Sequence, residues 1–219
     1  MDFFPIFFDI KNKPCLVVGG GEVATRKAGM LMQSGGLVTI VAPKLTHTLE
    51  ELADAGGITH IAEKFSPDHL GAAVLVIAAT DDRAINEQVS AAAKALRIPV
   101  NVVDNADLCS FIMPSVIDRS PLVIAISSGG TSPVLARVIR AKLEAYIPAA
   151  YGRLAHFAAS FRDQVKNSIL PAKRRIFWEK VLQGPVAEMV LSGQDQTAKD
   201  KLQKMLAADS GDTPPRGEV

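Results

Sequence analysis

A run of three glycines, inside VVGGGEVA at residues 17–24, is the first stretch of the chain whose spacing indicates chemistry. Gly19, Gly21 and Ala24 fit the pattern G-x-G-x-x-G/A, which follows an apolar run and precedes a helix-prone one. In such a turn the first glycine permits a tight bend, the second lets a pyrophosphate approach the backbone, and the small third residue allows helix and strand to pack closely. The pattern predicts a dinucleotide site at a helix N-terminus, with a purely structural glycine turn as the alternative.

The far side of this predicted site lacks one expected group. The second apolar run ends in Pro43 and Lys44, where an acid that binds the ribose hydroxyls is usual. Lys44 would accommodate a 2′-phosphate and hence NADP, or backbone groups alone would hold the adenosine, and the sequence leaves both open. Thr80 and Asp81 close the next run and would contact the cofactor, unless Asp81 and Asp82 only cap the following helix.

Two further positions could take part in chemistry. Asp104 ends the run VNVVD, and a carboxylate there can accept a proton or meet a ligand nitrogen or metal ion, with loop capping as the alternative. The segment AISSGGTSP, at residues 125–133, places Ser127 and Ser128 before a helix start, where a carboxylate or phosphate could dock. A flexible turn with an N-cap is the alternative for this segment.

Other reaction types lack the residues they need. His47, His60, His69 and His156 have no partner at metal-ligand spacing, and the two cysteines are far apart, so we predict neither a metal site nor a disulfide. No Tyr-x-x-x-Lys pair and no Ser/His/Asp arrangement stands out, which weakens carbonyl reductases and hydrolases as alternatives.

The elements that must position these residues alternate along the first half of the chain. Short runs rich in valine and isoleucine, at residues 13–19, 37–43, 73–80 and 99–104, are typical of buried parallel strands. Helical periodicity covers residues 22–34 and 82–96. The alternation predicts an α/β fold, a Rossmann-type doubly wound parallel sheet whose ligand crevice lies at the carboxyl ends of the strands.

The pattern changes after Asp104. Two apolar segments separated only by DRSP, at residues 118–121, predict antiparallel strands, because the turn is too short for a crossover helix. A helix then starts with Ser132 as N-cap and Pro133 at its first position, ends before Pro148, and gathers apolar residues on one face: Val134, Leu135, Val138, Ile139 and Leu143. Amphipathic helices follow, with breaks near Pro171 and Gly184.

Composition limits the classes of protein. The chain has 219 residues, is 48% hydrophobic and 21% charged, and has no apolar run long enough to cross a bilayer and no basic leader at its start, so we expect a cytoplasmic globular protein. Residues 1–113 have 9 basic and 13 acidic side chains, whereas residues 114–190 have 11 and 5. This asymmetry predicts a polyanionic partner near the junction, with solvated helix faces as the alternative. Nucleic acid is disfavoured, because only 5% of residues are aromatic and no recognition motif is present.

Longer stretches identify a family. PIFFDIKNKPCLVVGGGEVATRKAGML, VLVIAATDD, NVVDNADLCSFIMPSVIDRSPLVIAISSGGTSPVLAR and RRIFWEK together resemble the N-terminal module of bacterial siroheme synthases, which has precorrin-2 dehydrogenase and sirohydrochlorin ferrochelatase activities. The resemblance implies a NAD-binding Rossmann domain at residues 1–113, a small α+β dimerisation region at 114–148, a C-terminal helical domain at 149–208, and a linker or disordered tail at 209–219. It also implies a homodimer, and a uroporphyrinogen methyltransferase domain after the segment RGEV in the full-length protein.

The same resemblance implies roles for individual residues. NAD would lie at the glycine turn, with contacts from Glu22 and Val23 and, on the far side, from Pro43 and Lys44. Asp104 would serve both reactions, oxidation of precorrin-2 to sirohydrochlorin and insertion of Fe²⁺ as the chelatase substrate. Ser128 would lie at the active site, and phosphorylation is associated with the matching serine of the family.

The charges of the chain are compatible with these roles. Precorrin-2 is a polycarboxylate, which suits the basic second half, and we expect four cations to contribute: Arg119, Arg137, Arg140 and Lys142. Asp104 is a plausible base for the proton that leaves the macrocycle during oxidation. A non-catalytic dimeric module that senses NAD is the competing hypothesis; it explains the glycine turn and the helices but neither the basic junction nor the block after Asp104.

Overall fold

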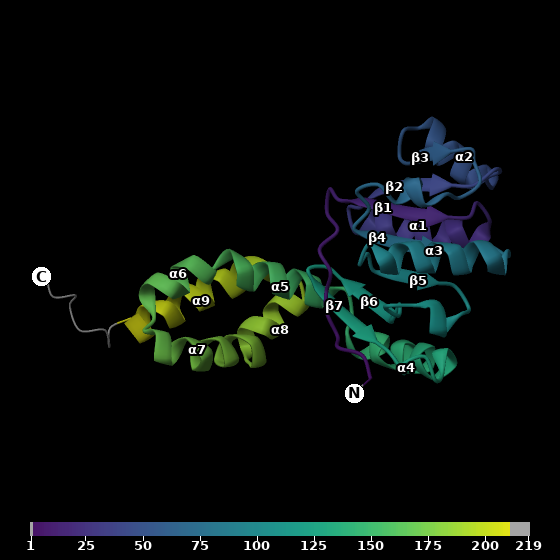
Figure 1. Ribbon diagram of the computed structural model, residues 1–219. Coiled ribbons are helices and arrows are strands. Elements are labelled where there is room, and N and C mark those ends of the chain that lie inside the picture. The colour runs from purple at the N-terminus through teal and green to yellow at the C-terminus, as the bar shows by residue number, and fades with distance from the viewer. Residues whose placement is uncertain (1, 211–219) are drawn as a thin grey trace, which may run out of the picture. The chain divides into compact units, whose positions relative to one another are not determined.

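The computed structural model describes residues 2–210 and divides into two compact units (Figure 1). The first unit contains the chain up to Met113 together with Gly129–Thr131, and the second contains Pro114–Ser128 and the chain from Ser132 onward. The finer division that we predict, at residues 113, 148 and 208, stays a prediction. Most of the predicted tail, residues 211–219, lies outside the described residues.

A parallel sheet of five strands forms the centre of the first unit, as the sequence predicts for this fold class. Its strand order is β3-β2-β1-β4-β5. Four strands agree with predicted ones, but the edge strand β3 was not predicted, because its residues Thr59–Ile61 contain no run of valine or isoleucine. The bounds are β1 (Pro14–Val18), β2 (Leu37–Val41), β3 (Thr59–Ile61), β4 (Leu75–Ala78) and β5 (Val100–Val102).

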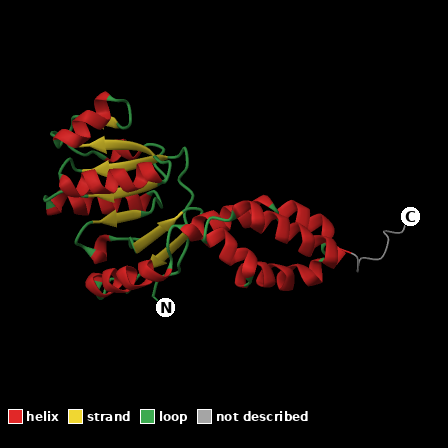
Figure 2. Ribbon diagram, turned by 180° about the vertical axis from the view of Figure 1, so that it is seen from behind, coloured by secondary structure: helices red, strands yellow, loops and turns green. Residues whose placement is uncertain are grey.

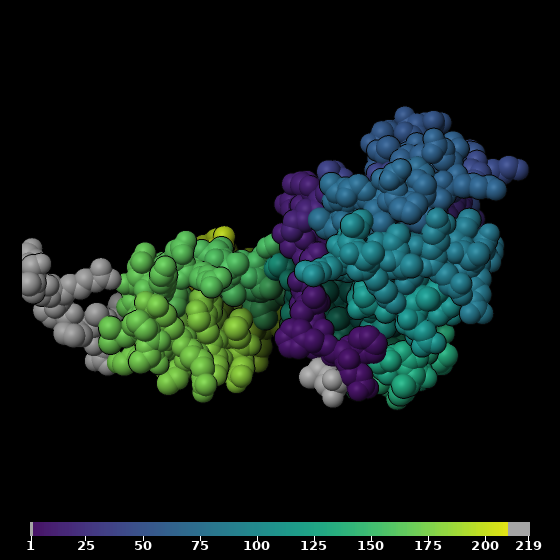
Figure 3. All heavy atoms as spheres, viewed as in Figure 1, coloured from purple at the N-terminus to yellow at the C-terminus, as the bar shows by residue number. Residues whose placement is uncertain are grey.

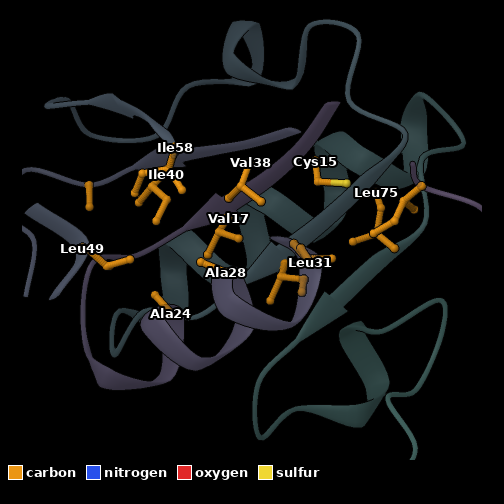
Figure 4. Packing of buried hydrophobic residues seen from close by; sticks show 13 residues of the cluster. Cys15, Val17, Ala24, Ala28, Leu31, Val38, Ile40, Leu49, Ile58 and Leu75 are labelled. Atoms are coloured by element: carbon orange, nitrogen blue, oxygen red, sulfur yellow. The ribbon is translucent and has the colours of Figure 1, made fainter. Parts of the chain in front are cut away.

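Helices cover both faces of this sheet (Figure 2). Cys15 and Val17 of β1 pack with Ala24 and Ala28 of α1 in one buried cluster (Figure 4). Leu16 belongs to a second cluster, together with buried residues of α3. The alternation of side chains along one strand thus builds two cores. The helical segments of this unit are α1 (Glu22–Gln33), α2 (His47–Asp54), α3 (Arg83–Ala95) and the 3₁₀ turns η1 (Pro67–Leu70) and η2 (Ala106–Leu108).

The second unit begins with an antiparallel hairpin and a helix. Strands β6 (Ser115–Arg119) and β7 (Leu122–Ile126) pair as predicted, and α4 (Pro133–Tyr146) follows. The predicted N-cap is correct, because the Ser132 hydroxyl accepts a hydrogen bond from the backbone nitrogen of Leu135. This pairing explains why the helix starts where the sequence indicates.

The structure corrects the expectation that Arg119 is one of the cations available to the carboxylates of a substrate. Its side chain is only 18% exposed, and its guanidinium donates to the carbonyl oxygen of Ile147 at 2.9 Å and to the Glu144 carboxylate at 3.3 Å. Arg140 donates to the same carboxylate at 2.7 Å. These bonds hold the hairpin to α4, so Arg119 is a structural cation. Arg137 and Lys142 are exposed.

Helices complete the second unit and form a core of their own. Phe157, Phe161, Phe177, Val181 and Leu202 are buried together in it. Among the helices that the structure describes, none combines the length and the apolar character needed to cross a bilayer. The helices are α5 (Ala150–Ser160), α6 (Arg162–Ser168), α7 (Pro171–Gln183), α8 (Pro185–Leu191) and α9 (Asp195–Ser210), with the breaks at Pro171 and Gly184 that the sequence predicts.

Two apolar surfaces remain exposed. In the first unit, Phe4 and Phe7 of the N-terminal segment are 84% and 75% exposed; Figure 3 shows atoms of this segment in purple. In the second unit, Val138 and Ile139 lie on the apolar face of α4 and are 45% and 38% exposed, and Val134 and Leu135 beside them are more so. In α4 only Ala136 is buried, so this face is not used in the core of the described chain.

Candidate functional site

A cleft of about 790 Å³ opens at the carboxyl ends of β1, β2 and β4. All seven residues predicted to bind the cofactor line it: Gly19, Gly21, Glu22, Val23, Pro43, Lys44 and Thr80. They come from three separate stretches of the chain, which the strand order brings together. This is the position at which ligands bind in doubly wound sheets.

The glycine turn has the geometry of an anion site. Gly19 has φ of +120°, and a Cβ atom there would collide with the carbonyl oxygen of Ala79, so only glycine fits. Gly21 is the N-cap of α1, where no side chain makes a capping hydrogen bond, and a Cβ atom at Gly21 would meet nothing within 4 Å. The first-turn N–H groups of α1 therefore remain available to a phosphate. Ala24 is fully buried, which permits close packing of the helix.

Gly20 has a role that the motif does not assign. A Cβ atom at Gly20 would collide with the carbonyl oxygen of Lys44. The Gly20 carbonyl oxygen accepts a hydrogen bond from the Thr46 nitrogen at 2.9 Å, and the Thr46 and Thr25 hydroxyls lie 2.8 Å apart. Gly20 thus holds the glycine turn against the loop that follows β2.

The far rim of the cleft includes residues that sequence reasoning missed. Glu63, Lys64 and Phe65 follow β3 and line the same space as Pro43 and Lys44. They were missed because β3 was not predicted. Glu63 supplies an acid to the rim, whereas the end of β2 has none.

Thr80 and Asp82 hold the third side of the cleft. The Thr80 hydroxyl donates to the Asn86 side-chain oxygen at 2.9 Å, and Asp82 accepts from the backbone nitrogens of Ala84 and Ile85. Asp82 is therefore the N-cap of α3, which is the capping role given above as the alternative to a cofactor contact. Asp81 lines the cleft and is exposed.

Asp104 lies just after β5 and is not among the residues that line the cleft. It is exposed, and its φ of +57° is uncommon for a residue other than glycine. The chain then returns along β5, where the Ser110 nitrogen donates to the Val100 oxygen and the Val100 nitrogen donates to the Ser110 hydroxyl, both at 2.8 Å. This return holds both ends of the loop that carries Asp104.

Lys27 of α1 is the charged neighbour of Asp104. Its side chain is half-buried, and its ammonium donates to the Met113 sulfur at 3.1 Å. Burial and, to a smaller degree, Arg26 lower the pKa of Lys27, while the Asp104 carboxylate and the Cys109 thiol act in the opposite direction. The Asp104 carboxylate thus favours the charged form of Lys27, but burial outweighs it.

Ser128 belongs to the second unit, whereas Asp104 belongs to the first. The Ser128 hydroxyl accepts a hydrogen bond from the Ser132 nitrogen at 2.9 Å, and the residue is half-buried. Ser128 therefore closes the turn that leads into α4. Within residues 2–210 no group of three or more His, Cys, Asp or Glu side chains is arranged to hold a metal ion.

Known families match almost the whole chain. A family described as NAD(P)-binding matches residues 6–115, one described as "Sirohaem biosynthesis protein central" matches residues 119–146, and one described as "Sirohaem synthase dimerisation region" matches residues 150–206. The siroheme synthase of Nitrosospira multiformis is 57% identical over 224 residues and that of Nitrosomonas eutropha is 57% identical over 221, in both cases covering 100% of this chain.

The relatives are longer than this chain. It spans 47% of the Nitrosospira protein and 46% of the Nitrosomonas one, about half of each. Among solved structures, the precorrin-2 dehydrogenase SirC has the same fold, with a TM-score of 0.75 and 22% identity, over 94% of this chain and 100% of that one.

Proposed function

Because this chain belongs to the NAD(P)-binding family found in siroheme synthases, we propose that it oxidises precorrin-2 to sirohydrochlorin with NAD⁺ as the hydride acceptor. The observation that carries the proposal is the uncapped N-terminus of α1, which opens into the cleft at the carboxyl ends of the strands. NAD⁺ supplies the hydride-accepting ring when it is bound. The remaining work of binding, orientation and proton transfer falls to the residues of the chain.

Different cleft residues bind different parts of the cofactor. Gly19 and Gly21 let the pyrophosphate approach the backbone, and the N–H groups of Glu22 and Val23 stand at the positive end of the α1 dipole. Pro43 and Lys44 hold the adenosine end, chiefly through the backbone. Thr80 bounds the opposite side, at the end of β4.

Asp104 is the proposed base. Oxidation of the macrocycle removes a hydride and a proton, and an exposed carboxylate beside the end of β5 can accept that proton. The left-handed backbone at Asp104 is a strained conformation, and strain of this kind is common where a side chain must be presented to a ligand.

We further propose that the same site inserts Fe²⁺, its substrate, into sirohydrochlorin to give siroheme. Insertion exchanges pyrrole N–H protons for the metal, and Asp104 would accept these protons as it does in the oxidation. The names of the relatives that are 57% identical support this second activity. Ser128, in the turn between β7 and α4, is proposed to contact the macrocycle or to be phosphorylated, as the family resemblance implies.

A homodimer completes the proposal. The exposed apolar face of α4 is the surface that a second copy would cover, and on this basis we assign dimer contacts to residues 114–148. The matched family that is described as a dimerisation region covers the helices that follow, residues 150–206, and supports a dimer without placing its contacts on α4. In the full-length protein a uroporphyrinogen methyltransferase domain would follow, since the relatives are about twice as long as the chain.

The function is tested by an anaerobic spectrophotometric assay of precorrin-2 with NAD⁺, followed by addition of Fe²⁺. We expect the wild type to form NADH and sirohydrochlorin, and then siroheme. The variant Asp104→Ala should lose oxidation while its NAD⁺ affinity, measured by calorimetry, stays nearly unchanged. A folded wild type that binds NAD⁺ but forms no NADH would instead favour the non-catalytic sensing module.

A further inference from the structure

Lys27 is a charged group that the proposed chemistry does not use. It lies on α1, five residues after Glu22, or about 7.5 Å further along the helix axis at about 1.5 Å per residue. Unlike Glu22 and Val23, it is not among the residues that line the cofactor cleft. Its position therefore separates it from the pyrophosphate, and its ammonium contacts Met113, nine residues after Asp104.

The bonding of Lys27 is weak for a half-buried cation. The hydrogen bond described for its ammonium goes to the Met113 sulfur, and a thioether is a poor acceptor. No ion pair within 4.0 Å is described for this ammonium, whereas Lys13 has one with Asp9. Removing part of the water around an ammonium without a strong acceptor is unfavourable, which makes the group a candidate for binding a ligand.

An anionic ligand would supply what the ammonium lacks. A carboxylate forms a charge-assisted hydrogen bond with a lysine, stronger than the bond that a thioether accepts. The ammonium contacts Met113, in the segment that follows Asp104 and is tied to β5 by the hydrogen bond from Asn101 to Phe111. The Asp104 carboxylate also acts on the pKa of Lys27, in the direction opposite to burial. A macrocycle with peripheral carboxylates could therefore contact Lys27 while its reacting carbon lies near Asp104.

We propose that Lys27 binds a peripheral carboxylate of the tetrapyrrole and so positions the macrocycle against Asp104. This assignment rests on the function proposed above. It makes Lys27 a substrate-binding residue that acts on the substrate and not on the cofactor. The assignment also explains why a partly buried ammonium is present here, because a substrate carboxylate would replace the hydrogen bonds to water that burial removes.

The test compares Lys27→Met with Lys27→Arg in the 219-residue chain. Arg26→Met serves as the matched control, because it removes one positive charge from the adjacent, exposed position of the same helix. Uroporphyrin, a stable porphyrin polycarboxylate, is titrated by fluorescence, and the KM for precorrin-2 is measured anaerobically. NAD⁺ affinity and Tm are measured for every variant.

We expect Lys27→Met to weaken uroporphyrin binding and to raise the KM for precorrin-2 by about tenfold or more, the loss typical of one hydrogen bond to a charged group. Lys27→Arg should lose less, and Arg26→Met should stay within about twofold of the wild type. NAD⁺ affinity should not change, and the Tm of Lys27→Met should be above that of the wild type. A structural lysine would lower Tm instead.

Two outcomes would overturn the inference in different ways. If the wild type oxidises precorrin-2 and Lys27→Met keeps its affinity for uroporphyrin and its KM, Lys27 does not bind the substrate, and the proposed function stands. If the wild type forms no NADH with precorrin-2, the proposed function fails and the assignment of Lys27 fails with it.

Discussion

The Sγ atom of Cys109 accepts a hydrogen bond from the backbone nitrogen of Val102 at 3.1 Å, and it lies 3.3 Å from the carbonyl oxygen of Asn105, to which the thiol donates. The side chain of Asn101 donates to the carbonyl oxygen of Phe111 at 3.1 Å. Together these bonds close the loop that carries Asp104 onto the edge of β5. The Cys109 thiol and the Asn101 amide thus make hydrogen bonds at the edge of β5, where the described sheet has no further strand.

Removal of the Cys109 thiol should loosen this loop. Cys109→Ala leaves the Val102 nitrogen without its acceptor, which should lower the free energy of unfolding by about 1 kcal/mol and reduce kcat for precorrin-2 with little change in NAD⁺ affinity. Cys109→Ser keeps a donor and an acceptor and should recover most of the kcat. Hydrogen exchange of residues 103–110 measures the loosening directly, and unchanged protection in Cys109→Ala would contradict the prediction.

Adjacent glycines in the turn should respond differently to substitution. Gly20→Ala forces a methyl group against the Lys44 carbonyl oxygen and should lower the free energy of unfolding by about 1–3 kcal/mol. Gly21→Ala meets open space and should leave stability unchanged, whereas Gly21→Asp places a carboxylate against the pyrophosphate and should weaken NAD⁺ binding. Denaturant unfolding and calorimetry check these outcomes, and unchanged NAD⁺ affinity in Gly21→Asp would show that the cofactor site is elsewhere.

The charge of Lys27 should reduce the stability of the ligand-free protein. Its pKa is lowered from the ordinary 10.5, chiefly by burial, so the unfolded chain binds more protons than the folded protein in the window below 10.5. Stability therefore increases as pH rises through that window, and the penalty is fully present below it. Lys27→Met should remove the penalty, so its advantage in Tm over the wild type should be present at pH 7 and shrink toward pH 10.5. Equal pH profiles of Tm for the two proteins would refute this.

The apolar face of α4 should hold the homodimer together. Val138→Asp places a charge in the middle of this face and should shift the protein to a monomer, as measured by sedimentation at micromolar concentration. Arg137→Asp, which is exposed on another side of the helix, should leave the dimer intact. A Val138→Asp dimer of wild-type affinity would mean that other residues form the interface.

Local patterns were sufficient for most of the elements. Four strands of the sheet and helices α1 and α3 were predictable because continuous valine and isoleucine runs alternate with helical periodicity. Strand β3 and helix α2 were not predicted. Ile61 is the only apolar residue of β3, so this strand has no apolar run. Helix α2 is short, and the available signal for it was its N-cap Thr46, whose hydroxyl accepts a hydrogen bond from the Leu49 nitrogen.

The sequence by itself determined the glycine turn and the placement of Asp104 just after a strand, because these depend on spacing within short segments. Only the tertiary structure decided which cations are available and which residues complete the cleft. Arg119 reads in the sequence as a free charge but pairs with Glu144, 25 positions away. Lys27 donates to the Met113 sulfur, 86 positions away, and such contacts depend on chain topology and not on local pattern.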